Sequence, residues 1–128
     1  MRDFKKFTVW QLSHQLVLKI YQVTKTFPKE EMFGLISQIR RSFASISYNI
    51  SEGAGRSSDK EFANFLNIAL GSSNEAENQL LLAKDLEYLN QEDFEILHQE
   101  LVIVKKQLVA FRNTLNNNSA ERQIVISQ

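Results

Sequence analysis

The sequence predicts an all-α protein that folds as one antiparallel, up-down-up-down four-helix bundle. Along four segments of the 128 residues, apolar side chains recur every three or four positions, which is the period of a helix with one buried face. One proline and four glycines are too few turn residues for a fold of many short strands. We expect a bundle domain over residues 1–118, with helices at about 8–27, 29–52, 58–88 and 91–116.

A proline separates the first two predicted helices. Pro28 ends the first helix, because the residue before a proline is pushed out of the helical region. We expect the glycines of Gly53-Ala54-Gly55 to cap the second helix at its C-terminus. The apolar stripes are Trp10, Val17, Ile20, Tyr21, Thr24 and Phe27 in the first helix, and Leu35, Ile39, Phe43, Ile46 and Ile50 in the second.

Capping signals mark the starts of the third and fourth helices. Ser58 and Glu61 have the spacing of a capping box, and Asn90 suits an N-cap. Small residues around Gly71 predict that a neighbouring helix approaches closely there, with Phe43 filling the space. The third helix is expected to bury Phe62, Phe65, Leu66, Ala69, Ala76, Leu80, Ala83 and Leu86.

The fourth helix carries the most regular pattern in the chain. Its apolar seam comprises Phe94, Leu97, Leu101, Val104, Leu108, Phe111 and Leu115. We expect Asn116-Asn117-Asn118 to end it and residues 119–128 to form a flexible tail. Apolar residues outside the main stripes are Leu12, Leu16 and Leu18 in the first helix and Ile96, Val102, Ile103 and Val109 in the fourth. They predict homo-oligomerisation, or else a wide core stripe with scattered exposed residues.

Several classes of function are excluded or disfavoured by the residues present. Without cysteine there is no disulfide, thiolate zinc site or cysteine nucleophile. Glu95 and His98 have a metal-binding spacing, but the seam turns both away from the bundle centre and no second such pair exists. Gly53-Ala54-Gly55 lacks the third glycine of a dinucleotide loop. We expect no enzymatic activity, no cofactor and no metal.

The cellular location is predicted from the absence of a membrane-spanning segment and of a signal peptide in this sequence. The longest apolar runs, Leu80–Ala83 and Leu101–Val104 among them, are four residues long and too short to span a membrane. The first six residues, Met1 to Lys6, lack the apolar region of a signal peptide. A cytoplasmic protein is expected.

The zero net charge conceals an asymmetry along the chain. Residues 1–60 carry ten Lys and Arg against five Asp and Glu, and residues 61–128 carry five against ten. We therefore expect the first half to present a basic surface to nucleic acid or to the acidic surface of a partner, or else the two halves to attract each other within the fold or an oligomer.

Polar side chains form a stripe on the second helix. Gln38, Arg41, Ser45, Asn49 and Glu52 fall within roughly 80° of one another. Arg56 would join them if the helix continued. One interpretation is structural, with a Glu52–Arg56 ion pair at the helix end and a local hydrogen bond from Asn49. The other is functional, with the stripe contacting a phosphate backbone or another subunit.

Beyond these patterns, the chain resembles a known family. The resemblance runs through residues 4–89 and is carried by Val9-Trp10, Ile20-Tyr21, Thr24, Phe27-Pro28, Gly34-Leu35, Gln38-Ile39-Arg40-Arg41, Ser45-Ile46, Asn49-Ile50, Glu52-Gly53, Gly55-Arg56, Glu61-Phe62, Phe65-Leu66, Ala69-Leu70-Gly71-Ser72 and Glu75. The chain is similar to the four-helix bundle proteins encoded in intervening sequences of bacterial 23S rRNA genes. The accessory variability proteins of diversity-generating retroelements belong to the same family.

The resemblance implies a ring-shaped homopentamer. It also implies, for the retroelement branch, a basic protein that binds nucleic acid and works with a reverse transcriptase. The intervening-sequence branch has no well-defined biochemical activity. This chain departs from the basic branch in its zero net charge and isoelectric point near 6.7. Ser47-Tyr48 also replaces an expected Pro-Ala or similar pair, which favours an unbroken second helix.

Two hypotheses follow for the function. In the first, a homo-oligomer binds RNA or DNA through phosphate contacts from Lys5, Lys6, Arg40, Arg41 and Arg56, while Gln38, Ser45, Asn49 and Glu52 form a polar stripe or subunit interface. In the second, the protein is an oligomeric interaction scaffold without nucleic-acid binding. There Arg40 and Arg41 pair across subunits with carboxylates such as Glu75 or Glu77.

Overall fold

The protein consists of four helices packed along one another. The structure, a computed structural model, describes the backbone of residues 2–127 and the side chains of residues 2–120. The helices are α1 (Thr8–Thr24), α2 (Leu35–Ala54), α3 (Asp59–Asp85) and α4 (Gln91–Ser127), with one-turn 3₁₀ helices η1 (Phe4–Lys6) and η2 (Lys29–Glu31). No strand occurs between residues 2 and 127, so the all-α prediction is confirmed.

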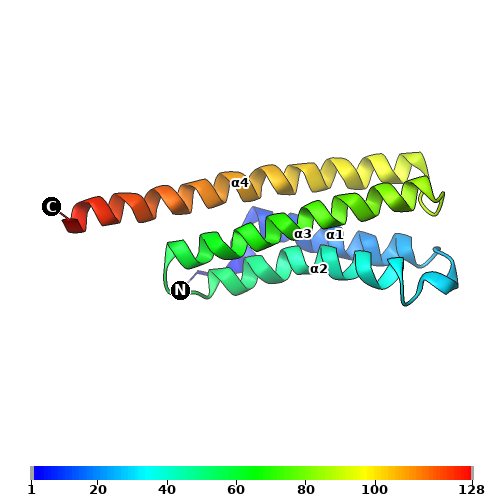
Figure 1. The fold of residues 1–128 in the computed structure, drawn as a ribbon, viewed down its shortest axis with the longest axis horizontal. Coiled ribbons are helices and arrows are strands. Elements are labelled where there is room, and N and C mark those ends of the chain that lie inside the picture. The colour runs from blue at the N-terminus through cyan, green and yellow to red at the C-terminus, as the bar shows by residue number, and fades with distance from the viewer. Residues whose placement is uncertain (1, 128) are drawn as a thin grey trace.

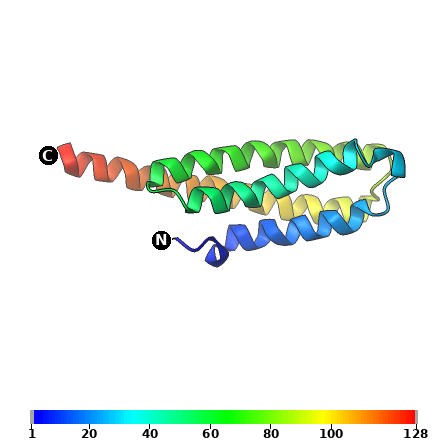
Figure 2. The ribbon, with the colours of Figure 1, turned by 90° about the horizontal axis from the view of Figure 1, so that it is seen from below.

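Each helix has two helical neighbours. α2 lies between α1 and α3, and α4 closes the bundle by packing against both α3 and α1. The connections between successive helices alternate between the two ends of the molecule (Figure 1). In the view turned by 90°, α4 reaches past the end of the other three helices (Figure 2).

The predicted stripes of α2 and α4 form the core. All five stripe residues of α2 are buried, and Phe43 and Ile50 are completely inaccessible. Six of the seven seam residues of α4 are buried as well, while Phe111 is half-buried against the same core. Strict three- and four-residue spacing therefore located the buried face of these two helices correctly.

The stripe predicted for α1 is rotated from the one observed. Its buried residues are Val9, Ser13, Leu16, Ile20 and Thr24. Tyr21 is 44% exposed, so the prediction that it is buried is wrong. Polar Ser13 and Thr24 tolerate burial because each hydroxyl donates to a carbonyl four residues earlier, at 2.7 Å. Leu86 is the corresponding exception in α3, since it is the C-cap residue and is 45% exposed.

The helix boundaries shift at several places. α1 ends at Thr24, three residues before the predicted end, and η2 replaces the first turn predicted for the second helix. Because Lys25, Thr26 and Phe27 donate to carbonyls three residues back, the chain tightens into a turn before Pro28. α2 runs without a break through Ser47 and Tyr48, as expected.

The glycines confirm one sequence prediction and contradict another. Gly55 is the C-cap of α2, as predicted, and its φ of −82° is not left-handed. Gly71 is exposed, and a Cβ there would meet nothing within 4 Å, so the close approach predicted at this residue is wrong. Close packing occurs instead at Gly53, where a Cβ would lie 2.7 Å from both Phe62 Cδ1 and Phe65 Cβ.

The caps of α3 and α4 follow the prediction. Ser58 Oγ accepts a hydrogen bond from the Glu61 amide at 3.1 Å, and Asn90 Oδ1 accepts one from the Asp93 amide at 2.7 Å. At the other end of α3, the Tyr88 amide donates to the Ala83 carbonyl, which is the pattern of a Schellman motif. Its left-handed position is taken by Glu87, with φ 64°.

The fourth helix is longer than predicted. It passes through Asn116-Asn117-Asn118, where the sequence predicted its end, and continues to Ser127. Asparagine has only modestly low helix propensity, and no glycine or proline interrupts this segment. The flexibility expected of residues 119–128 and the domain boundary at 118 stay predictions, and residue 128 and the side chains of residues 121–127 lie outside the described part.

Candidate nucleic-acid interface

Arg40 joins α2 to α1. Its Nε donates to Thr24 Oγ1 at 2.9 Å, and its guanidinium lies over the ring of Tyr21 with Cζ 4.6 Å from the centroid. Its Nη2 also approaches the Tyr21 carbonyl at 3.4 Å. This arrangement holds the guanidinium of a half-buried side chain in one place. Arg40 is therefore a positioned cation that packs the two helices together.

Arg41 lies beside Arg40 in an open groove. The groove, about 510 Å³ in volume, is called the Arg41 groove below. Its lining comprises Tyr21, Met32, Ile36, Arg40, Arg41 and Tyr48, with the smaller Ser37, Ala44 and Ser45. No carboxylate is among these residues. Arg41 is exposed and makes no ion pair or side-chain hydrogen bond with a described residue, so its charge is available to a ligand.

Arg56 sits at the opposite end of α2. Its Nη2 donates to Glu52 Oε1 at 2.8 Å, and its Cζ lies 4.8 Å from the centroid of the Phe65 ring. The structural interpretation of this pair is therefore confirmed: it is an ion pair at the helix end. Both side chains are exposed, so the pair contributes little to stability and can exchange partners.

The N-terminal segment packs against the same end of the molecule. Arg2 forms an ion pair with Asp59, donates to the Arg56 carbonyl at 2.8 Å, and lies over the ring of Phe62. These contacts hold η1, which carries Lys5 and Lys6, near the C-terminus of α2. Lys5 approaches Asp3 at 3.9 Å, whereas Lys6 is exposed and has no such partner among the described residues.

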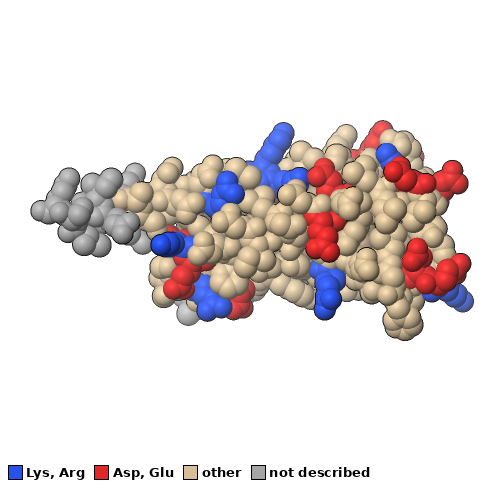
Figure 3. Space-filling view, viewed as in Figure 1, with Lys and Arg blue, Asp and Glu red and all other residues tan. Residues whose placement is uncertain are grey.

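The five predicted cations form two groups rather than one patch. Arg41 is about 20 Å along the helix axis from the end of α2 at Ala54, near which Lys5, Lys6 and Arg56 lie. On the face shown in Figure 3, acidic side chains are numerous at the end with η2 and the α3–α4 connection, and others lie at mid-length and near the opposite end. Lysines and arginines are scattered along the whole of that face.

The polar stripe of α2 is mostly an internal network. Asn49 Nδ2 donates to the Ser45 carbonyl at 2.8 Å and contacts Ser45 Oγ at 3.0 Å. Ser45 Oγ is in turn 2.8 Å from Ser72 Oγ of α3. The local hydrogen bond predicted for Asn49 is thus present. Gln38 is exposed and its side chain bonds to no described residue.

A second charged cluster connects α3 to α4. Glu77 accepts hydrogen bonds from Lys105 Nζ at 2.9 Å and lies 2.7 Å from His98 Nε2. The hydrogen bond from Lys105 and then that with His98 lower the pKa of the Glu77 carboxyl. Glu95 points elsewhere and accepts from Gln91 at 2.9 Å. Among the described residues, no three His, Asp or Glu side chains are placed to hold a metal.

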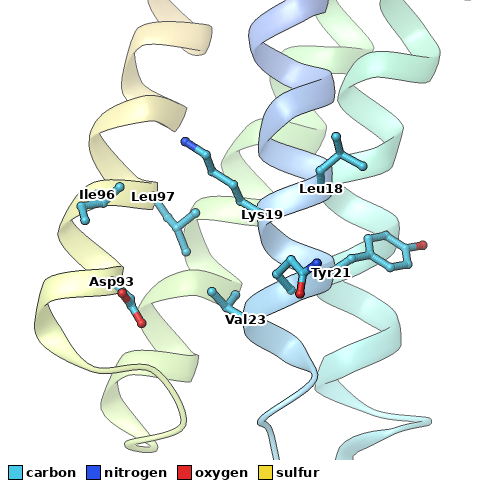
Figure 4. Close-up of a pocket in the computed structure, with 8 residues that line it drawn as sticks. Leu18, Lys19, Tyr21, Val23, Asp93, Ile96 and Leu97 are labelled. Atoms are coloured by element: carbon cyan, nitrogen blue, oxygen red, sulfur yellow. The ribbon is translucent and has the colours of Figure 1, made fainter.

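An apolar groove of about 510 Å³ lies along the contact between α1 and α4. It is lined by Leu18, Lys19, Tyr21, Gln22, Val23, Asp93, Ile96 and Leu97. Figure 4 shows Val23 and Leu97 between the two helices, while Leu18 points away from α4. Leu18 and Ile96, two of the apolar residues outside the predicted stripes, are each 49% exposed. Over residues 2–127, none of the helices has the length and apolar character to cross a membrane.

Comparison with known proteins places the chain in a family. The sequence profile described as 23S rRNA-intervening sequence protein matches residues 5–110. The chain belongs to the 23S rRNA-intervening sequence protein family. A crystal structure from the S23 ribosomal protein family, of a Bacteroides thetaiotaomicron protein with unknown function, is similar to it with 31% identity and a TM-score of 0.76. That similarity covers 82% of this chain and 98% of the other. Among curated proteins, none matches the chain.

In this 23S rRNA-intervening sequence protein, the sequence alone does not single out the aromatic part of the Arg41 groove. Tyr21 belongs to the apolar stripe of α1, and Tyr48 is only a departure from the family pattern. One signal was available: Tyr48 follows Arg41 by seven residues, which places both on the same face of a helix. Arg2, which fixes the N-terminal segment, carries no sequence signal of that role.

Proposed function

We propose that this protein is a non-enzymatic, homo-oligomeric bundle of antiparallel helices that associates with RNA or DNA in the cytoplasm. The observation that carries the proposal is the Arg41 groove, in which two arginines meet without a carboxylate. A guanidinium that has no acidic partner suits a phosphate oxygen, because charge-assisted hydrogen bonds of this kind are among the stronger ones. Membership of a family named for 23S rRNA supports the same partner class.

The cations near the end of α2 play a secondary part in this proposal. Lys6 is exposed and adds a phosphate contact, while Lys5 and Arg56 exchange their present partners, Asp3 and Glu52, for phosphate. Because part of their charge is already neutralised, each contributes less than Arg41.

A ring-shaped homopentamer would multiply these weak contacts. The exposed apolar side chains around the α1–α4 groove, Leu18 and Ile96 among them, support a subunit contact there, since such residues gain from being covered. Five linked copies of the Arg41 groove raise the affinity through avidity when one nucleic acid reaches several of them. The expected particle has five times the chain mass of 14.8 kDa.

The test is a fluorescence-anisotropy titration of a structured rRNA fragment and a random duplex at several salt concentrations. We expect a micromolar Kd at low salt. The logarithm of the association constant should fall steeply with the logarithm of the salt concentration, with a slope of about −0.9 per phosphate contacted on duplex DNA and about −0.7 on single strands. Arg41→Ala should reduce this slope by about one contact per bound subunit. Lys106→Ala is the matched control, since it removes an exposed cation of α4 outside the groove.

The competing function is an oligomeric scaffold that binds proteins alone. The exposed apolar side chains of α4, Ile96, Ile103 and Val109, are the observation that favours it. Absence of nucleic-acid binding even at low salt would reject the proposed function in favour of this one. If Arg40→Ala or Arg41→Ala instead lowers the particle mass in light scattering, the arginines act in a subunit contact.

A further inference from the structure

We propose that the Arg41 groove binds an unpaired nucleotide, whose base stacks on the ring of Tyr48 while Arg41 contacts the adjacent phosphate. This inference rests on the proposed function and names the form of nucleic acid that the groove selects. It makes Tyr48 the residue that distinguishes single strands from duplexes.

Tyr48 has the exposure that a stacking platform needs. Its side chain is 69% exposed, although it lies in the middle of a helix whose core face is fully packed. No other aromatic ring among the described residues contacts it. The packing of the fold therefore leaves this aromatic surface unused. Covering it with a planar base removes apolar area from water and adds a stacking interaction.

The spacing of Tyr48 and Arg41 matches a base with its backbone. Seven residues correspond to almost two full helical turns, so both side chains leave the same face of α2 about 10 Å apart along its axis. Both line the same groove. A nucleotide seated there can therefore place its base at one residue and a phosphate at the other.

The opposite wall of the groove is held in place before a ligand arrives. Arg40 is fixed by its bond to Thr24 and by its position over Tyr21. Its Nη1 makes no hydrogen bond with a described residue, which leaves a donor for a second phosphate oxygen. Met32, 47% exposed at the rim, supplies a flexible apolar side chain that can adapt to different bases.

The groove favours single strands because a duplex leaves no base face accessible for stacking. In a duplex the bases are stacked on one another, so no base face is open to Tyr48. In a single strand the bases can turn outward and stack on an aromatic side chain. The volume of about 510 Å³ suits one small ligand group rather than the width of a helix.

The charges of the groove favour nucleic acid over an apolar protein surface. Two guanidinium groups line it without a carboxylate, so an apolar protein partner would cover Arg41 without providing an acceptor. Burying an unpaired charge is costly, whereas phosphate provides the acceptor directly.

The experiment compares one labelled single-stranded RNA of about 15 nucleotides, long enough for several stacking contacts, with the same strand annealed to its complement. Fluorescence anisotropy is measured for the wild type, Tyr48→Ala, Tyr48→Trp and Phe33→Ala. Phe33 is the matched control because it is 95% exposed but does not line the groove.

We expect Tyr48→Ala to weaken single-strand binding by about 5- to 150-fold, the range seen when one stacking aromatic is removed. Duplex binding should stay within about twofold of the wild type, because it rests on phosphate contacts. Tyr48→Trp should retain single-strand affinity, and Phe33→Ala should change neither. Thermal unfolding of Tyr48→Ala should match the wild type, since the side chain is largely exposed.

Three outcomes would overturn the inference, and the measurements distinguish them from one another. If Tyr48→Ala weakens single strand and duplex equally, or neither, nucleic-acid binding stands and the stacking inference is overturned. If the wild type binds neither strand form at low salt, the proposed function fails and takes the inference with it. If Tyr48→Ala lowers the particle mass, the groove is an interface between copies of this chain, which also overturns the inference.

Discussion

The close packing of α2 against α3 at Gly53 can be tested by its effect on stability, with Gly71 as a comparison site in open space. A Cβ at Gly53 would lie 2.7 Å from Phe62 Cδ1 and from Phe65 Cβ, whereas a Cβ at Gly71 would enter open space. Phe62 is fully buried, so its ring cannot move into solvent to relieve the clash. A glycine-to-alanine substitution therefore places the new methyl group in a crowded contact at Gly53 of α2 and in open space at Gly71 of α3.

The magnitudes follow from two opposing effects. Alanine in a helix interior is favoured over glycine by at most about 1 kcal/mol, and less near a helix end. Overpacking a well-filled contact costs about 1–3 kcal/mol. Gly71→Ala should therefore raise the free energy of unfolding by about 1 kcal/mol, while Gly53→Ala should lower it by about 1–2 kcal/mol.

The assay is urea unfolding followed by far-UV circular dichroism at one fixed protein concentration, with the particle mass checked for each variant. A change in midpoint without a change in slope reports a change in stability. The reasoning is refuted if Gly53→Ala is as stable as the wild type, because the close approach of α2 and α3 would then be absent. If Gly71→Ala is destabilising and lowers the mass, Gly71 lies in a contact between subunits.

Three further predictions concern single residues. Glu87→Gly should raise the free energy of unfolding by about 0.5 kcal/mol, because φ 64° suits glycine; Glu87→Ala is the control without this gain, and a destabilised glycine variant would contradict the account. Gln79→Met should stabilise by about 1 kcal/mol in urea unfolding, because buried Gln79 Oε1 has no hydrogen-bond partner among the described residues; a loss of stability would show that the oxygen is satisfied. The lowered pKa of Glu77 means that its stabilising contribution is present above the ordinary carboxyl pKa of 4.5 and is lost as the pH falls through the lower folded value. Glu77→Gln should flatten the decline of the unfolding midpoint as the pH falls below 4.5, and an unchanged decline would exclude a role for the bonds from Lys105 and His98.

The predictability of the fold depended on whether one apolar stripe of a helix keeps regular spacing. In α2 and α4 one stripe keeps strict three- and four-residue spacing, so their buried faces follow directly from the sequence, although α4 also carries apolar residues outside that stripe. α1 carries leucines and aromatics on two faces, and Leu16 rather than Tyr21 enters the core. Arg40 of α2 lies over Tyr21 and donates to Thr24, which lies sixteen residues earlier, and local periodicity has no access to such contacts.

The candidate site was predictable in its charges but not in its shape. Arg40 and Arg41 stand out as adjacent cations, yet only the fold assigns one to the contact with α1 and the other to an open groove. Gly71 was assigned a packing role that belongs to Gly53, because the role depends on which helix lies opposite. The Glu52–Arg56 pair followed from four-residue spacing alone.

The bond between Arg40 and Thr24 also couples the groove to the integrity of α1. Arg40, Arg41 and Tyr48 belong to α2, but Tyr21 lines the groove only while α1 is docked, so a ligand that requires Tyr21, or Arg40 as Tyr21 and Thr24 hold it, binds the docked state alone. By mass action, such a ligand must reduce local opening of α1 by the factor one plus its concentration over its Kd. Amides along α1 would then exchange with solvent more slowly when the groove is filled, including those far from any nucleotide. The opening equilibrium of α1 would thus report whether the Arg41 groove, which is built mainly by α2, is occupied.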